Sequence, residues 1–147
     1  MSGNMSGNMS GNTLIEGASA CVAKAAVLVV EDDVLTRMAT SEELRDYGYS
    51  VVEAANVDEA LAVLHGPTRI DLVVTDMKMP GALDGAALAQ HIRTELPFVK
   101  VVMISGQTPA PEVRRILDGY LPKPVAPADL ASYVQELTPA HVSSKAS

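Results

Sequence analysis

The fold of this chain is decided by the stretch Ala25-Ala26-Val27-Leu28-Val29-Val30-Glu31-Asp32-Asp33. An unbroken apolar run, rich in β-branched residues, stops abruptly at three acids. A strand that is apolar on both faces is typical of the centre of a parallel sheet, because helices cover both sides of such a sheet. The stretch therefore predicts a buried central strand that carries acidic side chains at its carboxyl end.

Working outward from this strand, apolar runs alternate with helical patterns along the chain. We expect strands at 25–30, 50–54, 70–75, 99–104 and 119–122. Between and after them we expect helices at 34–47, from Asn56 to Gly66, from Asp84 or Gly85 to Leu96, at 111–117 and at 127–137. Strict alternation implies parallel strands with right-handed crossovers and helices on both faces.

The common solution for five such units is an α/β, flavodoxin-like, doubly wound five-stranded parallel sheet with strand order 2-1-3-4-5. Pro122 agrees with this order, since proline cannot donate to a strand ladder and its strand should lie at an edge. Local signals mark the helix ends. Gly48 suits a helix C-terminus, Asn56 with Glu59 suits a capping box, and Ala126 lacks the side chain that caps a helix.

Composition and charge exclude several classes of function. The net charge of −7 and the lack of any basic cluster larger than Arg114-Arg115 argue against nucleic-acid binding. No apolar run approaches the length of a membrane span, and no signal peptide is visible, so the default location is cytoplasmic. Cys21 is the single cysteine. The three histidines show no metal-ligand spacing with one another or with Cys21: His65, His91 and His141.

We expect one domain at 25–137, preceded by a flexible extension at 1–24 and followed by a tail at 138–147. The extension opens with a threefold Met-Ser-Gly-Asn repeat that cannot build a core. After Leu137 only ten residues remain, so no output domain is expected.

Chemistry-bearing residues follow the strands at their carboxyl ends, where ligands bind in open parallel sheets. Clustered carboxylates repel one another, and Mg²⁺ resolves that repulsion with oxygen ligands. We expect two or three of the carboxylates of Glu31, Asp32, Asp33 and Asp76 to hold Mg²⁺, together with a backbone carbonyl near Lys78. Asp76 can then act as nucleophile toward a phosphoryl group, Lys123 supplies a positive charge to a phosphate oxygen, and the Ser105 hydroxyl binds another. Asp33 either supports the metal from outside its ligand shell or caps the helix that follows.

Four segments resemble the signatures of the receiver domains of two-component systems: residues 27–33, Asp76-Met-Lys-Met-Pro80-Gly81, Ile104-Ser105-Gly106 and Tyr120-Leu-Pro-Lys123-Pro124. The resemblance covers about Ala25 to Leu137. It implies Asp76 as phospho-acceptor, Glu31 and Asp32 as the acid pair, Ser105 and Tyr120 as the switch residues, Lys123 as the family's lysine, and a cis Lys123-Pro124 bond. It also implies a sensor histidine kinase or a histidine phosphotransfer protein as partner, and a possible homodimer.

The resemblance departs from the family between Ser105 and Lys123, where the chain is shorter by about one helical turn. Pro109 and Pro111 crowd the start of this segment, so its helix should be short or displaced. We therefore expect the family's usual switch and dimer face to be altered in this chain.

Four functions remain open on the sequence alone. The chain is a receiver that acts by binding a partner, a relay intermediate or a receiver from a hybrid kinase, a receiver that signals without phosphate, or a haloacid-dehalogenase-type phosphatase. The phosphatase resemblance is the weaker one, because Lys78 stands where that class has its second aspartate and the first strand does not carry the nucleophile. A receiver would assist its own phosphorylation without being a turnover enzyme.

Overall fold

The computed structural model of the chain describes residues 24–79, 81 and 83–138. Apart from Lys24 and Thr138, the extension and the tail expected from the sequence therefore lie outside the described residues. The strands in chain order are β2 (Ala26–Val30), β3 (Ser50–Ala54), β4 (Leu72–Asp76), β5 (Lys100–Ser105) and β6 (Gly119–Pro122).

The five strands form one parallel sheet in the order β3-β2-β4-β5-β6. Numbered by their place in the chain, this is the order 2-1-3-4-5, and the predicted fold class is confirmed. Pro122 lies in β6 at the edge of the sheet, as its missing N–H requires.

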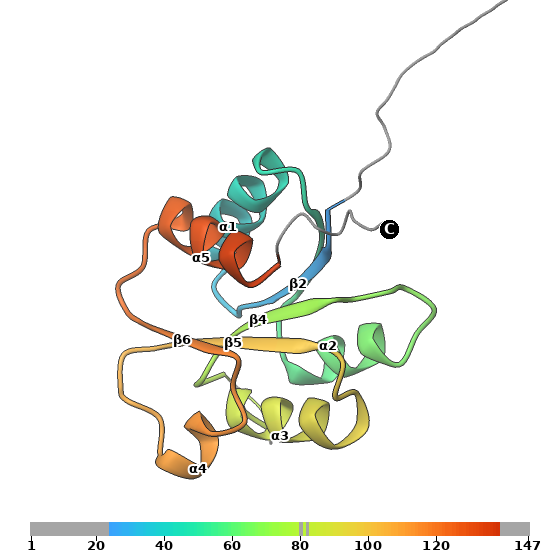
Figure 1. The fold of residues 1–147 in the computed structure, drawn as a ribbon, viewed down its shortest axis with the longest axis vertical. Coiled ribbons are helices and arrows are strands. Elements are labelled where there is room, and N and C mark those ends of the chain that lie inside the picture. Colours follow the sequence, from blue (N-terminus) through green and yellow to red (C-terminus); the bar gives the residue numbers. More distant parts are fainter. Residues whose placement is uncertain (1–23, 80, 82, 139–147) are drawn as a thin grey trace, which may run out of the picture.

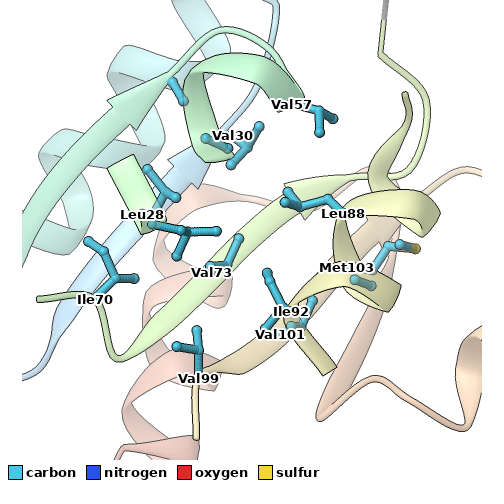
Figure 2. Packing of buried hydrophobic residues seen from close by; sticks show 14 residues of the cluster. Leu28, Val30, Val57, Ile70, Val73, Leu88, Ile92, Val99, Val101 and Met103 are labelled. Carbon is cyan, nitrogen blue, oxygen red and sulfur yellow. The ribbon is translucent and has the colours of Figure 1, made fainter. Parts of the chain in front are cut away.

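The helices are α1 (Val34–Asp46), α2 (Val57–Leu64), α3 (Gly85–Glu95), α4 (Pro111–Arg114) and α5 (Pro127–Leu137). Figure 1 shows α1 and α5 on one face of the sheet and α2 and α3 on the other. The side chains of β2 alternate between the two faces. Val27 and Val29 pack toward α1 and α5, whereas Leu28 and Val30 pack toward α2 and α3 (Figure 2). Both sets are buried, which explains why this strand carries no polar residue.

Several boundaries differ from the sequence-based prediction by a residue or more, and the start of β4 and the end of α4 depend on contacts between residues distant in the chain. β4 begins at Leu72 rather than at Ile70, because Asp71 forms two hydrogen bonds with Ala26 at the start of β2. The Asp71 carboxylate accepts the Ala26 N–H at 2.8 Å, and the Asp71 N–H donates to the Ala26 carbonyl at 2.9 Å.

The helix expected at 111–117 is shorter, since α4 ends at Arg114. The chain then tightens into turns, and Arg93 of α3 holds this segment from the side. Its guanidinium donates to the Ile116 carbonyl at 3.2 Å and to the Asp118 carboxylate at 2.8 Å. The short helix that we expected from the shortened segment between Ser105 and Lys123, and from its two prolines, is confirmed.

The expected helix ends are also present. Gly48 follows α1 with a positive φ of 99°, a backbone conformation that glycine adopts without strain. The Asn56 side chain accepts the Glu59 N–H at 2.8 Å, and the Glu59 carboxylate accepts the Ala55 N–H at 2.7 Å. These two bonds close the N-terminus of α2 as a capping box does, although Glu59 reaches the residue before the N-cap rather than Asn56 itself.

The N-terminus of α5 has no side-chain cap, because Ala126 stands at the N-cap position. Ala126 is exposed and has the extended backbone that capping residues adopt. We expect Ala126→Ser to raise the free energy of unfolding by about 1 kcal/mol, since a hydroxyl there can accept an orphan helix N–H. Urea unfolding of Ala126→Ser beside Ala126→Val measures this gain. Equal stability of the two variants would contradict the prediction, because valine cannot cap.

Candidate functional site

The sheet brings the predicted residues to one edge. Glu31 follows β2 directly, Asp76 and Ser105 are the last residues of β4 and β5, and Lys123 follows β6. Neighbouring strands end in register, with Val30 opposite Thr75, Asp76 opposite Ile104 and Ser105 opposite Pro122. Four chain segments therefore present their polar side chains at the same rim of the sheet.

The acidic side chains of this rim lie close together. One carboxylate oxygen each of Glu31, Asp32 and Asp76 falls within a mutual distance of 4.8 Å. Asp76 is 9% exposed, whereas Asp32 is open to solvent. Burial raises the pKa of the Glu31 carboxyl, the nearby charge of Asp76 acts in the same direction, and the hydrogen bond from the Asp33 N–H partly opposes both. Oxygen donors so placed fit a hard divalent cation such as Mg²⁺.

Lys123 faces these acids across the rim. Its Nζ lies 2.8 Å from Oδ2 of Asp76, and its backbone N–H donates to the Ser105 carbonyl at 2.9 Å. The hydrogen bond to Asp76 raises the pKa of the Lys123 ammonium, and the charges of Asp76, Glu31 and Asp32 support this shift. The ammonium therefore stays charged beside the carboxylate. The Lys123-Pro124 peptide bond is cis, as the resemblance implies.

Ser105 lies in β5, and Tyr120 lies in the neighbouring edge strand β6. The Ser105 side chain is 4% exposed, and its Oγ accepts the Gln107 N–H at 3.0 Å and lies 3.6 Å from the Met77 sulfur. The Tyr120 hydroxyl donates weakly to the carbonyls of Ser105 at 3.5 Å and Gln107 at 3.4 Å. The aromatic ring of Tyr120 thus reaches over the loop that follows Ser105.

Two further candidates have different positions. Asp33 caps α1, since its carboxylate accepts from the N–H of Thr36 at 2.8 Å and from the Thr36 hydroxyl at 2.6 Å. These bonds lower the pKa of the Asp33 carboxyl. The sequence left two roles open for Asp33, support of the metal and capping of the helix. These contacts with Thr36 are those of a helix cap. Lys78 lies two residues beyond Asp76 with an exposed side chain, and its carbonyl as a metal ligand stays a prediction.

A cavity of about 300 Å³ opens beside the acids. Glu31, Asp76 and Lys123 line its polar side, and Thr36 and Thr40 of α1 line another wall. The remaining wall is apolar and comes from the strands and α5. Asp76 therefore has open space next to its carboxylate, which a nucleophile needs.

Sequence reasoning missed a residue that positions Asp76. Gly85 begins α3, and its N–H donates to the Met77 carbonyl at 2.8 Å. A Cβ at Gly85 would overlap the carbonyl oxygen of Asp76 and lie 2.9 Å from the Met77 Cα. The sequence signal was only an ordinary helix start, because the close approach of α3 to the end of β4 is a tertiary contact.

We therefore expect Gly85→Ala to lower the free energy of unfolding by about 1–3 kcal/mol, since backbone rather than a flexible side chain must shift. Gly106→Ala is the matched control, because a Cβ at Gly106 meets no atom within 4 Å. Urea unfolding of both variants measures the difference. A Gly85→Ala protein as stable as the Gly106→Ala protein would contradict the close approach.

Comparison with known proteins decides the family. The profile of the response regulator receiver domain matches residues 27–135. This chain is a member of the response regulator receiver family. Receiver domains of two-component systems serve phosphorylation-based signalling, so the resemblance inferred from the motifs is confirmed.

Individual relatives agree with this membership. The sensor kinase CckA of Brucella abortus is 34% identical over 128 residues, which is 84% of this chain and 13% of that protein. A receiver protein of Pseudomonas putida matches with a TM-score of 0.70 and 31% identity over 79% of this chain and 99% of that one. The response regulator TrrA of Thermotoga maritima, solved in complex with Mg²⁺-BeF, matches with a TM-score of 0.69 and 29% identity over 77% and 98% of the two chains.

The receiver chain spans 13%, 43% and 48% of the lengths of three curated relatives. Within the described residues, no helix combines the length and the apolar character that crossing a membrane requires.

Proposed function

We propose that this receiver accepts a phosphoryl group on Asp76, with Mg²⁺ held by Glu31, Asp32 and Asp76 and by the carbonyl of Lys78. The observation that carries the proposal is the cluster of three carboxylates within 4.8 Å of one another, with the Lys123 ammonium 2.8 Å from the acceptor. The ion would neutralise negative charge on the phosphoryl oxygens and relieve the repulsion among the acids.

The chain's own residues carry the transfer. A carboxylate oxygen of Asp76 attacks phosphorus from the open space beside it, and a P–O bond forms as the P–N bond of a phosphohistidine on the donor breaks. The electron pair of that bond stays on the donor imidazole. Lys123 is freed from Asp76 to bind a phosphoryl oxygen, which keeps a positive charge next to the group that has moved.

The switch is proposed at Ser105 and Tyr120. A phosphoryl oxygen on Asp76 would draw the Ser105 hydroxyl away from the Met77 sulfur and the Gln107 N–H, which are its present partners. The contacts of Tyr120 are to carbonyls of this same loop, so a shift of the loop would release the ring. Phosphorylation would thereby change the surface formed by α4, β6 and α5.

Exposed apolar residues on the first two turns of α1 support the proposal that the phosphoryl donor is a protein. Val34, Leu35 and Met38 are 54%, 76% and 46% exposed, although all three are large and apolar. Val34 and Leu35 follow Asp33 at the start of α1, and Met38 lies one turn further on, so the patch begins beside the acidic rim. An exposed apolar patch beside a reactive group suits a docking surface for the donor, which we propose is a sensor histidine kinase or a histidine phosphotransfer protein.

A relay role within a kinase system is the second candidate. It is favoured by the likeness to the sensor kinase CckA, which aligns with 84% of this chain. In that role the phosphoryl group on Asp76 would pass on to a histidine of another protein. Phosphotransfer profiling separates the two roles, because a relay returns phosphoryl to a histidine phosphotransfer protein and a terminal receiver loses it to water.

The decisive experiment is phosphorylation with acetyl phosphate. Intact-mass spectrometry should show the addition of one phosphoryl group in the presence of Mg²⁺ and little or none after chelation with EDTA, because the acids otherwise repel the phosphoryl oxygens. Adding Mg²⁺ back in excess over EDTA is the control and should restore the label. Equal labelling with and without the metal would overturn the proposed magnesium site. Steady turnover of small phosphate esters would contradict the view that this receiver is not a turnover enzyme.

A further inference from the structure

Two histidines that are 26 residues apart in the sequence meet on the face of the molecule that α2 and α3 form. His65 is the C-cap residue of α2, and His91 lies in α3. Their Nε2 atoms form a hydrogen bond at 2.8 Å, in which one ring is the donor and the other the acceptor. The ring centroids are 5.0 Å apart, and the ring planes cross at 85°. This pair could not be predicted from the sequence, because the spacing of the two residues fits no local metal-binding motif.

The backbone holds the pair in place while the rings keep some freedom. The His65 N–H donates to the Leu61 carbonyl at 2.9 Å, and the neighbours Leu64 and Ile92 are buried in the same core cluster. This shared core fixes the two helices relative to each other. The ring of His65 is exposed and that of His91 is half-buried, so both can turn and reach an ion from solvent.

We propose that His65 and His91 bind a divalent transition metal ion, of the class of Zn²⁺, Ni²⁺ or Cu²⁺, through their Nε2 atoms, with water as the remaining ligands. Metal–nitrogen bonds of about 2.0–2.1 Å place two neighbouring imidazole nitrogens roughly 2.8–3.4 Å apart, from a right angle to a tetrahedral angle at the metal. The observed separation of 2.8 Å lies at the lower end of this range. In the present pair the rings point at each other end to end, and one Nε2 carries the proton of the hydrogen bond. For both Nε2 atoms to bind one ion, each ring must tilt, and that proton must pass by exchange with water to Nδ1 of its own ring.

This site is distinct from the acidic rim in position and in chemistry. α2 starts near the carboxyl end of β3, and His65 is at the far end of the helix, away from Asp76. Imidazole nitrogen prefers zinc, nickel and copper, whereas the carboxylates of the rim prefer Mg²⁺. The histidine pair should therefore leave Mg²⁺ unbound, and excess Mg²⁺ competes for the acidic rim while the transition metal is titrated.

The test is calorimetric titration of the whole chain with Zn²⁺, and separately with Ni²⁺, in excess Mg²⁺. His65→Ala and His91→Ala should each weaken the site at least about tenfold, since even residues that only support a metal ligand contribute that much. His141→Ala removes the third histidine of the chain and should leave the affinity unchanged. Asp76→Asn should also leave it unchanged, so that failure of the proposed phosphoryl acceptor is distinguishable from failure of this site.

Nitrogen-15 spectra of the imidazoles give a second measurement. On addition of Zn²⁺ the Nε2 signals of His65 and His91 should both shift, and those of His141 should not. Unchanged Nε2 signals, wild-type affinity in either alanine variant, or loss of binding in Asp76→Asn would each overturn the proposal.

Discussion

Asp76→Asn should abolish the labelling of this receiver by acetyl phosphate and Mg²⁺. The amide that replaces the carboxylate has nearly the same shape, so the end of β4 keeps its place. It lacks the anionic oxygen that attacks phosphorus, and it removes one of the three carboxylates of the cluster. Intact-mass spectrometry should therefore show a single unmodified species where the wild type shows one added phosphoryl group.

The same strand region offers a matched control. Asp71 precedes β4 and binds the Ala26 N–H at the opposite end of the sheet. Asp71→Asn should keep the labelling of the wild type, although the lost charge slightly weakens its hydrogen bond with Ala26. If Asp76→Asn labels as well as Asp71→Asn does, Asp76 is not the acceptor and the assignment of the site fails.

Lys123→Gln should slow phosphorylation by about 10²–10³-fold, the usual cost of removing one positioned donor from a reacting group. The ammonium is 2.8 Å from Asp76, and in the proposed function it binds the incoming phosphoryl oxygens. Glutamine is one atom shorter than lysine and carries no charge, so it cannot replace the ammonium as a donor to the phosphoryl oxygens. Stopped-time labelling with acetyl phosphate, quantified by mass spectrometry, gives the rate.

Magnesium affinity separates this effect from a collapse of the site. Without the ammonium the acids attract cations more strongly, so Lys123→Gln should bind Mg²⁺ at least as tightly as the wild type does. Lys100→Gln, at the other end of β5, should change neither property. A Lys123→Gln protein that labels at the rate of Lys100→Gln would show that the lysine does not assist the transfer.

Much of this fold could be predicted because its signals are local. The apolar run of β2 predicted a strand buried on both faces, and Val27 and Leu28 pack on opposite faces of the sheet. Pro122 predicted an edge strand because a missing N–H excludes proline from the middle of a ladder. The boundaries of β4 and α4 were less accurate. They depend on Asp71 and Arg93, whose hydrogen bonds reach residues distant in the chain.

The residues of the site could be predicted from the sequence, but the contacts between them could not. The acids, the hydroxyl and the lysine each lie at the end of a strand or directly after it. Parallel strands bring their carboxyl ends to one edge of the sheet. Three contacts depend on how side chains are placed in the folded chain. Asp33 caps α1, Lys123 pairs with Asp76, and Met77 contacts Ser105. The residue type alone left the role of Asp33 open between two alternatives.

The sequence by itself determined the fold class, the family resemblance and the set of polar residues at the rim, because hydrophobic periodicity and strand ends are properties of neighbouring residues. That Gly85 must lack a side chain and that His65 meets His91 could be seen only in the folded chain. Both depend on how closely helices approach a strand end or each other. Such distances are set by the packing of the whole core, which no short segment of the sequence contains.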